Sequence, residues 1–147
     1  MNSERLYQQV GEAIHLAQTL ELTIAVLISI LNERFHAGID DRLLIHDEDR
    51  RTLGQLIREM KKHGDLNEEA ANTLSEALEA RNYIAHHFFT RNIEAFKSEA
   101  GCTSALALLD KRAKQIAAAT AVTGGFVQSF CQAFKIKPAD VMVRQDT

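Results

Sequence analysis

Apolar residues recur at helical spacing along most of the chain, and this pattern predicts a protein built of helices. Between residues 4 and 36 they alternate in steps of four and three, which places them along one side of a helix. These positions are Leu6, Val10, Ala13, Ala17, Leu20, Ile24, Leu27 and Leu31. Ser3 is the expected N-cap of this first helix, and Gly38 is expected to end it.

Two shorter helices are predicted next. Thr52 and Gln55 have capping-box spacing and open a second helix that ends at Gly64. Asn67 is expected to cap a third helix that reaches about residue 89, because its side-chain oxygen accepts from the first free amides.

A fourth long helix is predicted after a connection over 90–101, with Thr103 or Ser104 as its N-cap. Its apolar side is formed by Leu106, Leu109, Ala113, Ile116, Thr120, Thr123, Val127, Phe130 and Phe134. The pattern therefore predicts an all-α, four- to five-helix up-down bundle. We expect a single domain over residues 1–137, followed by a loosely ordered tail over 138–147.

Composition restricts the possible functions. With 147 residues and a net charge of -3, the chain has no general basic field, so any contact with nucleic acid needs a local basic site. The longest apolar run, over 22–31, is shorter than a membrane span. Cys102 and Cys131 lack metal-type spacing and are expected to be free thiols. We therefore expect a cytoplasmic protein that does not enter a membrane.

The third helix carries one residue that does not fit its apolar side. That side reads Ala71, Leu74, Leu78, Arg81, Ala85 and Phe88. A guanidinium there needs a partner or an opening to solvent, because burying an unpaired charge is expensive. Arg81 is therefore either a structural partner of an acid or a residue that binds a ligand. Glu21, an acid in a row of mostly apolar residues on the first helix, is the expected partner. It would serve as a structural salt bridge or as an orienting group.

Asn82 and His86 are four residues apart and are therefore neighbours on one face of the third helix. Glu79 lies one turn earlier on that face, and His87 is either a second site residue or a surface histidine. Arg81 and His86 are five apart, roughly 140° around a regular helix, so one helix does not point both side chains the same way. This geometry favours a site formed by two copies about a two-fold axis.

A histidine and an arginine are sufficient for cleavage of RNA without a metal. The imidazole accepts the 2′-hydroxyl proton, the oxygen attacks the adjacent phosphorus, and the guanidinium stabilises the negative charge. The product would carry a 2′,3′-cyclic phosphate. We expect neither metal nor cofactor, because Glu12 with His15 and Glu33 with His36 are too far apart on one helix to share an ion.

The segment Arg81-Asn82-Tyr83-Ile84-Ala85-His86 resembles the signature of the HEPN superfamily, in which an arginine, a polar residue, a spacer and a histidine stand late in a helix of a small bundle. The helix opening at 52–56 is also similar to small bacterial members. The resemblance implies a homodimer, with the arginine and histidine at the dimer cleft of an RNase. In the branch paired with nucleotidyltransferase antitoxins, a tyrosine stands two residues after the histidine, whereas this chain has Phe88.

Three functions remain open from the sequence. The first is a metal-independent endoribonuclease of HEPN type with Arg81, Asn82 and His86 in the site, acting in toxin–antitoxin systems, defence or stress. The second is a catalytically silent module of the same fold that binds a partner protein, an antitoxin or a nucleotide. The third is a plain helical regulator in which Arg81 is structural.

Overall fold

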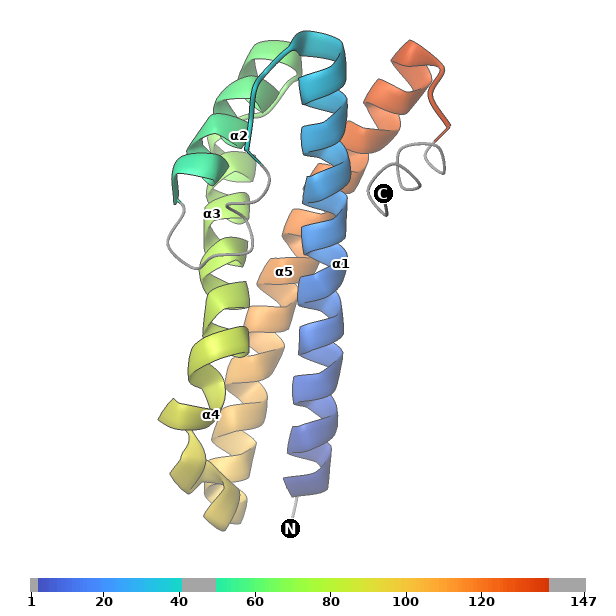
Figure 1. Ribbon diagram of the computed structural model, residues 1–147. Coiled ribbons are helices and arrows are strands. Elements are labelled where there is room, and N and C mark those ends of the chain that lie inside the picture. The colour runs from blue at the N-terminus through green and yellow to red at the C-terminus, as the bar shows by residue number, and fades with distance from the viewer. Residues whose placement is uncertain (1–2, 41–49, 138–147) are drawn as a thin grey trace.

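The computed structural model describes residues 3–40 and 50–137, and this part of the chain is helical and contains no strand (Figure 1). Its helices longer than one turn are α1 (Ser3–Phe35), α2 (Arg50–His63), α3 (Glu68–Asn82) and α5 (Glu99–Phe134). Between α3 and α5 lie a π-helical turn (Tyr83–His87), the short helix α4 (Phe88–Arg91) and a 3₁₀ segment (Ile93–Lys97). The predicted all-α class is confirmed, and the predicted tail over 138–147 lies outside the described residues.

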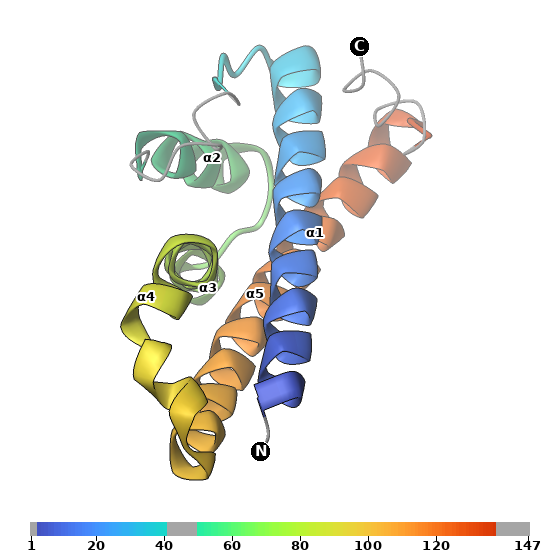
Figure 2. The ribbon, with the colours of Figure 1, turned by 60° about the horizontal axis from the view of Figure 1, so that its bottom comes forward.

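Helix α5 packs against both α1 and α3 and forms the centre of the molecule. In Figure 1, α1 and α5 run in the same direction and cross, while α3 runs the opposite way. Figure 2 shows α2 lying across this group rather than along it. The three longer packed helices thus alternate in direction as predicted, whereas α2 departs from a simple up-down bundle.

The predicted apolar sides of α1 and α5 are confirmed. All eight positions predicted for α1 are buried, and those of α5 are buried or half-buried. The third helix differs at Ala85, which is exposed, while its neighbour Ile84 is buried. The reason is local: the helix changes from α to π at Tyr83, and the wider turn rotates the following residues away from their regular positions.

The helix caps were predicted less well. Asn67 caps α3 as expected, since its Oδ1 accepts from the amide of Ala70 at 2.8 Å. Thr52, however, is not a cap: it lies inside α2, is fully buried, and donates to the carbonyl of Asp40. The cap of α5 is Ser98 rather than Thr103 or Ser104. The helix begins earlier than predicted because Gly101, expected in the preceding connection, lies in its first turn and donates its backbone N–H to the Ser98 hydroxyl.

Helix α1 is rich in apolar residues along its whole length. Within residues 3–40 and 50–137 it is the one helix long and apolar enough to cross a membrane by length and composition. The same property is typical of a core helix, and α1 buries a continuous side against α5.

Both cysteines, Cys102 and Cys131, are free and buried. Burial raises the pKa of the Cys131 thiol because the thiolate is poorly solvated.

Substituting Gly101 by alanine is expected to destabilise the fold by about 1–3 kcal/mol, because a Cβ there would lie 2.7 Å from the Cα and carbonyl oxygen of Ala95. Gly125→Ala is the matched control in the same helix. A Cβ at Gly125 meets nothing within 4 Å, so alanine should stabilise α5 by up to about 1 kcal/mol. Urea denaturation of the two variants would measure both values, and equal effects would contradict the close approach at Gly101.

Candidate functional site

Arg81 lies inside the molecule and pairs with Glu21. Its Nη1 donates to the Glu21 Oε1 at 2.9 Å, joining α3 to α1 over 60 positions of sequence. The Arg81 side chain is only 7% exposed, whereas that of Glu21 is 45% exposed. The predicted pairing is therefore confirmed, and the pair has one end in the core and the other in water.

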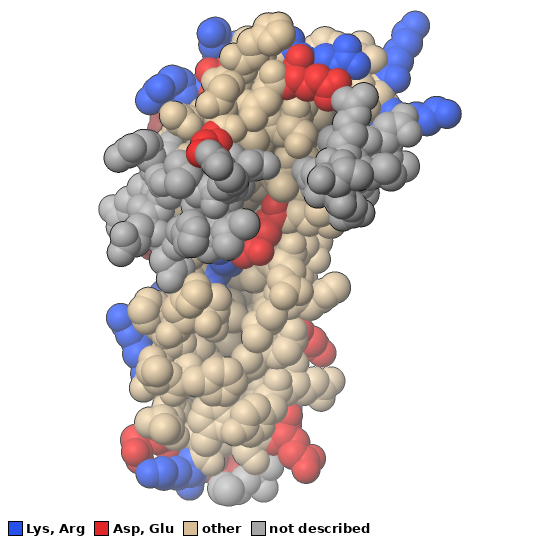
Figure 3. Space-filling view, in the orientation of Figure 1, with Lys and Arg blue, Asp and Glu red and all other residues tan. Residues whose placement is uncertain are grey.

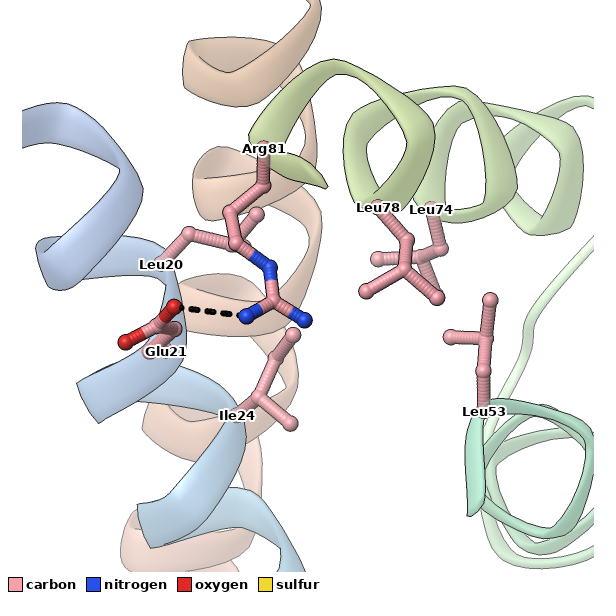
Figure 4. Close-up of a pocket in the computed structure, with 7 residues that line it drawn as sticks. All are labelled: Leu20, Glu21, Ile24, Leu53, Leu74, Leu78 and Arg81. Carbon is pink, nitrogen blue, oxygen red and sulfur yellow. Dashed lines mark hydrogen bonds and ion pairs between the residues drawn. The ribbon is translucent and has the colours of Figure 1, made fainter. Parts of the chain in front are cut away.

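The pair borders a small hollow between three helices. Figure 4 shows the guanidinium reaching from α3 towards α1. The lining residues are Leu20, Glu21, Ile24, Leu53, Leu74, Leu78 and Arg81. With a cavity volume of about 20 Å³, the hollow has room for about one water molecule. A nucleotide does not fit in this space, so a ligand of Arg81 would have to approach from the Glu21 side.

The motif histidine points outward, in contrast to the arginine. His86 and His87 are both exposed, and their ring centroids are 6.5 Å apart. Both belong to the π turn Tyr83–His87, in which backbone hydrogen bonds span five residues instead of four. The expectation of a regular helix at this point is wrong. Within one copy of the chain, Arg81 faces the core and His86 faces solvent.

The remaining predicted residues lie around this turn without joining the hollow. Asn82 is half-buried at the end of α3, and the exposed Glu79 lines a separate groove against Leu53 of α2. His87 is on the surface, and its backbone carbonyl accepts from the Thr90 hydroxyl at 3.1 Å. The structure therefore brings Arg81 and Glu21 together, and leaves His86 and Glu79 outside the hollow.

A second cluster near the motif could not be expected from the sequence. The hydroxyl of Tyr83 accepts from the side-chain Nδ2 of Asn92 at 2.7 Å. The guanidinium carbons of Arg91 and Arg112 lie 6.0 Å and 5.1 Å from the Tyr83 ring centroid. Arg112 comes from α5, so no local spacing connects it with Tyr83. The fold alone brings these four side chains together.

Comparison with known proteins shows no family: no family model, curated protein or solved structure matches the chain. Metal ligands do not gather in the described ranges, where no group of three histidine, cysteine, aspartate or glutamate residues could hold an ion. The features of this region that carry chemistry are the π turn, the Arg81–Glu21 pair and the cluster at Tyr83.

Proposed function

We propose that the protein is a metal-independent endoribonuclease of the HEPN type. The observation that carries this proposal is the π turn, which contains both the spacer and the histidine of the motif. Such turns inside α-helices are rare and occur frequently at functional sites. Here the turn begins two residues after Arg81, directly after Asn82, and presents an imidazole at the surface of a protein whose described residues are helical.

In this proposal, His86 is the general base. It accepts the proton of a 2′-hydroxyl, and the oxygen attacks the adjacent phosphorus while the 5′-oxygen leaves and takes up a proton. Its exposure gives an RNA strand access to the imidazole. Arg81 supplies charge stabilisation, for which a guanidinium is suited because it donates two parallel hydrogen bonds to phosphate oxygens. Asn82, four residues before His86, orients the imidazole.

The burial of Arg81 adds a requirement to this mechanism. Because Glu21 occupies one edge of the guanidinium, the phosphate has to exchange with the Glu21 carboxylate. Glu21 is suited to such an exchange, since nearly half of its side chain is already in contact with water. We therefore propose that Glu21 holds Arg81 in the free protein and releases it when RNA binds.

The direct test is incubation of the full chain with single-stranded RNA in EDTA, followed by analysis of the product ends. A 2′,3′-cyclic phosphate is expected, and DNA of the same sequence should remain intact because it lacks the nucleophile. RNA that stays intact, or that is cut only when a metal is added, would remove the nuclease proposal.

We further propose a homodimer, which is supported by the outer side of α1. Tyr7, Ile14 and Leu22 are exposed there although they are large and apolar. Gly11, Gln18 and Ala25 lie in the same stripe of the helix surface, which Glu21 borders one turn after Gln18. Figure 3 shows that uncharged residues cover most of the lower half of this face. Exposed apolar area of this kind is typical of a protein–protein interface.

The sizes of the residues along this stripe suit a second copy of the same helix. If two α1 helices pack antiparallel about a two-fold axis near Leu16, Leu22 faces Gly11 of the partner subunit and Tyr7 faces Ala25 of the partner subunit. Each large side chain then meets a small one, and Ile14 lies close to the axis. We call the six residues Tyr7, Gly11, Ile14, Gln18, Leu22 and Ala25 the α1 stripe.

Ile14→Glu is expected to convert the dimer to a monomer, because the two introduced carboxylates would be buried close together at the axis. Ile93→Glu is the matched control, since Ile93 is more exposed (63%) but belongs to the 3₁₀ segment and is not a residue of the α1 stripe. Light scattering at micromolar concentration would measure both masses. A monomeric wild type would contradict the dimer, and an Ile14→Glu dimer would contradict this surface.

A second candidate function is a catalytically silent helical module that binds a partner protein. The observation that favours it is the ion pair of the buried Arg81 with Glu21, which accounts for Arg81 without any substrate. The α1 stripe would then bind the partner instead of a second copy. We place either protein in the cytoplasm and propose a role in defence or stress, where an antitoxin would be the partner.

A further inference from the structure

The cluster at Tyr83 combines two cations with an aromatic ring next to the motif. Arg91 is the last residue of α4 and lies over the Tyr83 ring. Arg112 reaches the same ring from α5. Guanidinium groups held against an aromatic ring keep their hydrogen-bonding edges available, because the contact uses the face of the group. Tyr83 is itself fixed by the hydrogen bond from Asn92.

Neither arginine is neutralised by an acid within the described residues. Arg91 lies over the Tyr83 ring and forms no ion pair within the described residues, and the hydrogen bond of Arg112 goes to the neutral Oε1 of Gln115 at 3.4 Å. The Nε of Arg112 is buried without an acceptor in this part of the chain. The acids nearest in sequence are already paired, Glu94 with Lys97 and Asp110 with Lys114.

This arrangement places two positive charges against one aromatic ring in a protein whose net charge is -3. Holding a half-buried guanidinium without a counter-charge is unfavourable, and an anion that binds there would remove the cost. A phosphate group suits the position because its oxygens match the donor pairs of arginine. The cluster is thus the local basic site that an acidic protein needs in order to bind nucleic acid.

We propose that Arg91 and Arg112 bind backbone phosphates of a single-stranded RNA next to the phosphate that is cleaved. The assignment of RNA rests on the proposed function, and the position of the site rests on the π turn, which joins Tyr83 to His86 within three residues. A strand bound at the arginines would pass the exposed imidazole. Arg91 and Arg112 are therefore positioning residues, which act on where the strand lies.

The test is binding of a fluorescently labelled, fully 2′-O-methylated oligonucleotide to the full chain in EDTA, measured by anisotropy. This probe keeps every phosphate but cannot be cleaved. Arg91→Gln and Arg112→Gln should each weaken binding by about tenfold at low salt. Each should also reduce the slope of log affinity against log salt by about 0.7, the contribution of one phosphate contact to a single strand.

Arg58→Gln is the matched control, because Arg58 is also exposed but lies on α2, at the other end of the molecule (Figure 1). Its affinity and salt slope should equal those of the wild type. Arg91 is exposed, so its variant tests the site even if Arg112→Gln lowers the melting temperature. A wild-type salt slope in all three variants would overturn the site.

Two further outcomes separate this site from the nuclease proposal and from another source of phosphate. Arginine-dependent binding without RNA cleavage by the wild type would support the site and remove the nuclease. RNA cleavage together with binding that does not depend on either arginine would support the nuclease and overturn the arginine site. Titration with inorganic phosphate is the last arm: arginine-dependent phosphate binding without oligonucleotide binding would overturn RNA as the ligand.

Discussion

His86→Ala is expected to lower the rate of RNA cleavage in EDTA by about two orders of magnitude or more, because general-base catalysis contributes on that scale. Arg81→Met should cause a loss of similar size, since one charge-stabilising donor contributes about 10²–10³-fold. His36→Asn is the control: His36 is also exposed, but it follows the end of α1, outside the motif and outside the α1 stripe, and asparagine tolerates its positive φ. The measurement is initial cleavage of a labelled single strand.

Mixing the two inactive variants tests whether each site uses residues from both copies. If Arg81 of one subunit acts with His86 of the partner subunit, heterodimers formed by subunit exchange regain one intact site and part of the activity. Loss of activity in both variants without recovery on mixing would place the site within one chain. A fully active His86→Ala variant would contradict the proposed base.

Glu21→Ala is expected to destabilise the fold by about 3 kcal/mol, the lower end of the cost of removing the partner of a buried charge. The guanidinium of Arg81 would remain among leucine side chains. Arg81→Met should cost less than about 1.5 kcal/mol, because methionine fills a similar volume and the half-exposed carboxylate of Glu21 stays solvated. Urea denaturation of each variant would measure this asymmetry.

A double variant sharpens the same test. Once Arg81 is methionine, Glu21→Ala should cost little, so the two changes together should be less destabilising than Glu21→Ala alone. Glu12→Ala is the control on the same helix: Glu12 is exposed and bonds only to Gln8, so its removal should change stability by less than about 0.5 kcal/mol. Equal costs for Glu21→Ala and Arg81→Met would contradict the asymmetry.

The helices of this protein could be predicted because the spacing of apolar residues close together in the sequence specifies them. The four-and-three spacing in α1 and α5 repeats over many turns, so one misplaced residue does not change the assignment. The starts of α2 and α5 could not be predicted in the same way. Several polar residues compete for each cap, and tertiary contacts decide between them, as for Thr52, which turns inward to Asp40.

The candidate site likewise has features that the sequence predicted and features that it did not. The partnership of Arg81 with Glu21 could be predicted because each is a charge on an otherwise apolar side of a helix. That Arg81 and His86 point different ways could also be predicted, from their spacing of five, but the π turn itself could not, because its sequence, Tyr83 to His87, is compatible with an ordinary α-helix. The cluster of Arg91 and Arg112 depends on the packing of α5 and leaves no pattern in the sequence.

The π turn also determines which distant substitutions can change the site. It lies between two buried anchors, Arg81 before it and Phe88 after it, and Phe88 is fully buried. A π turn holds one more residue than an α turn, so the core has to keep both anchors in place for the extra residue to persist. Substitutions that loosen Phe88 would allow a regular α-helix to re-form, in which every later residue shifts by about 100° around the axis. The direction of the His86 imidazole thus depends on packing in the core. Substitutions in the core could therefore change the activity of the site while every residue of the motif stays the same.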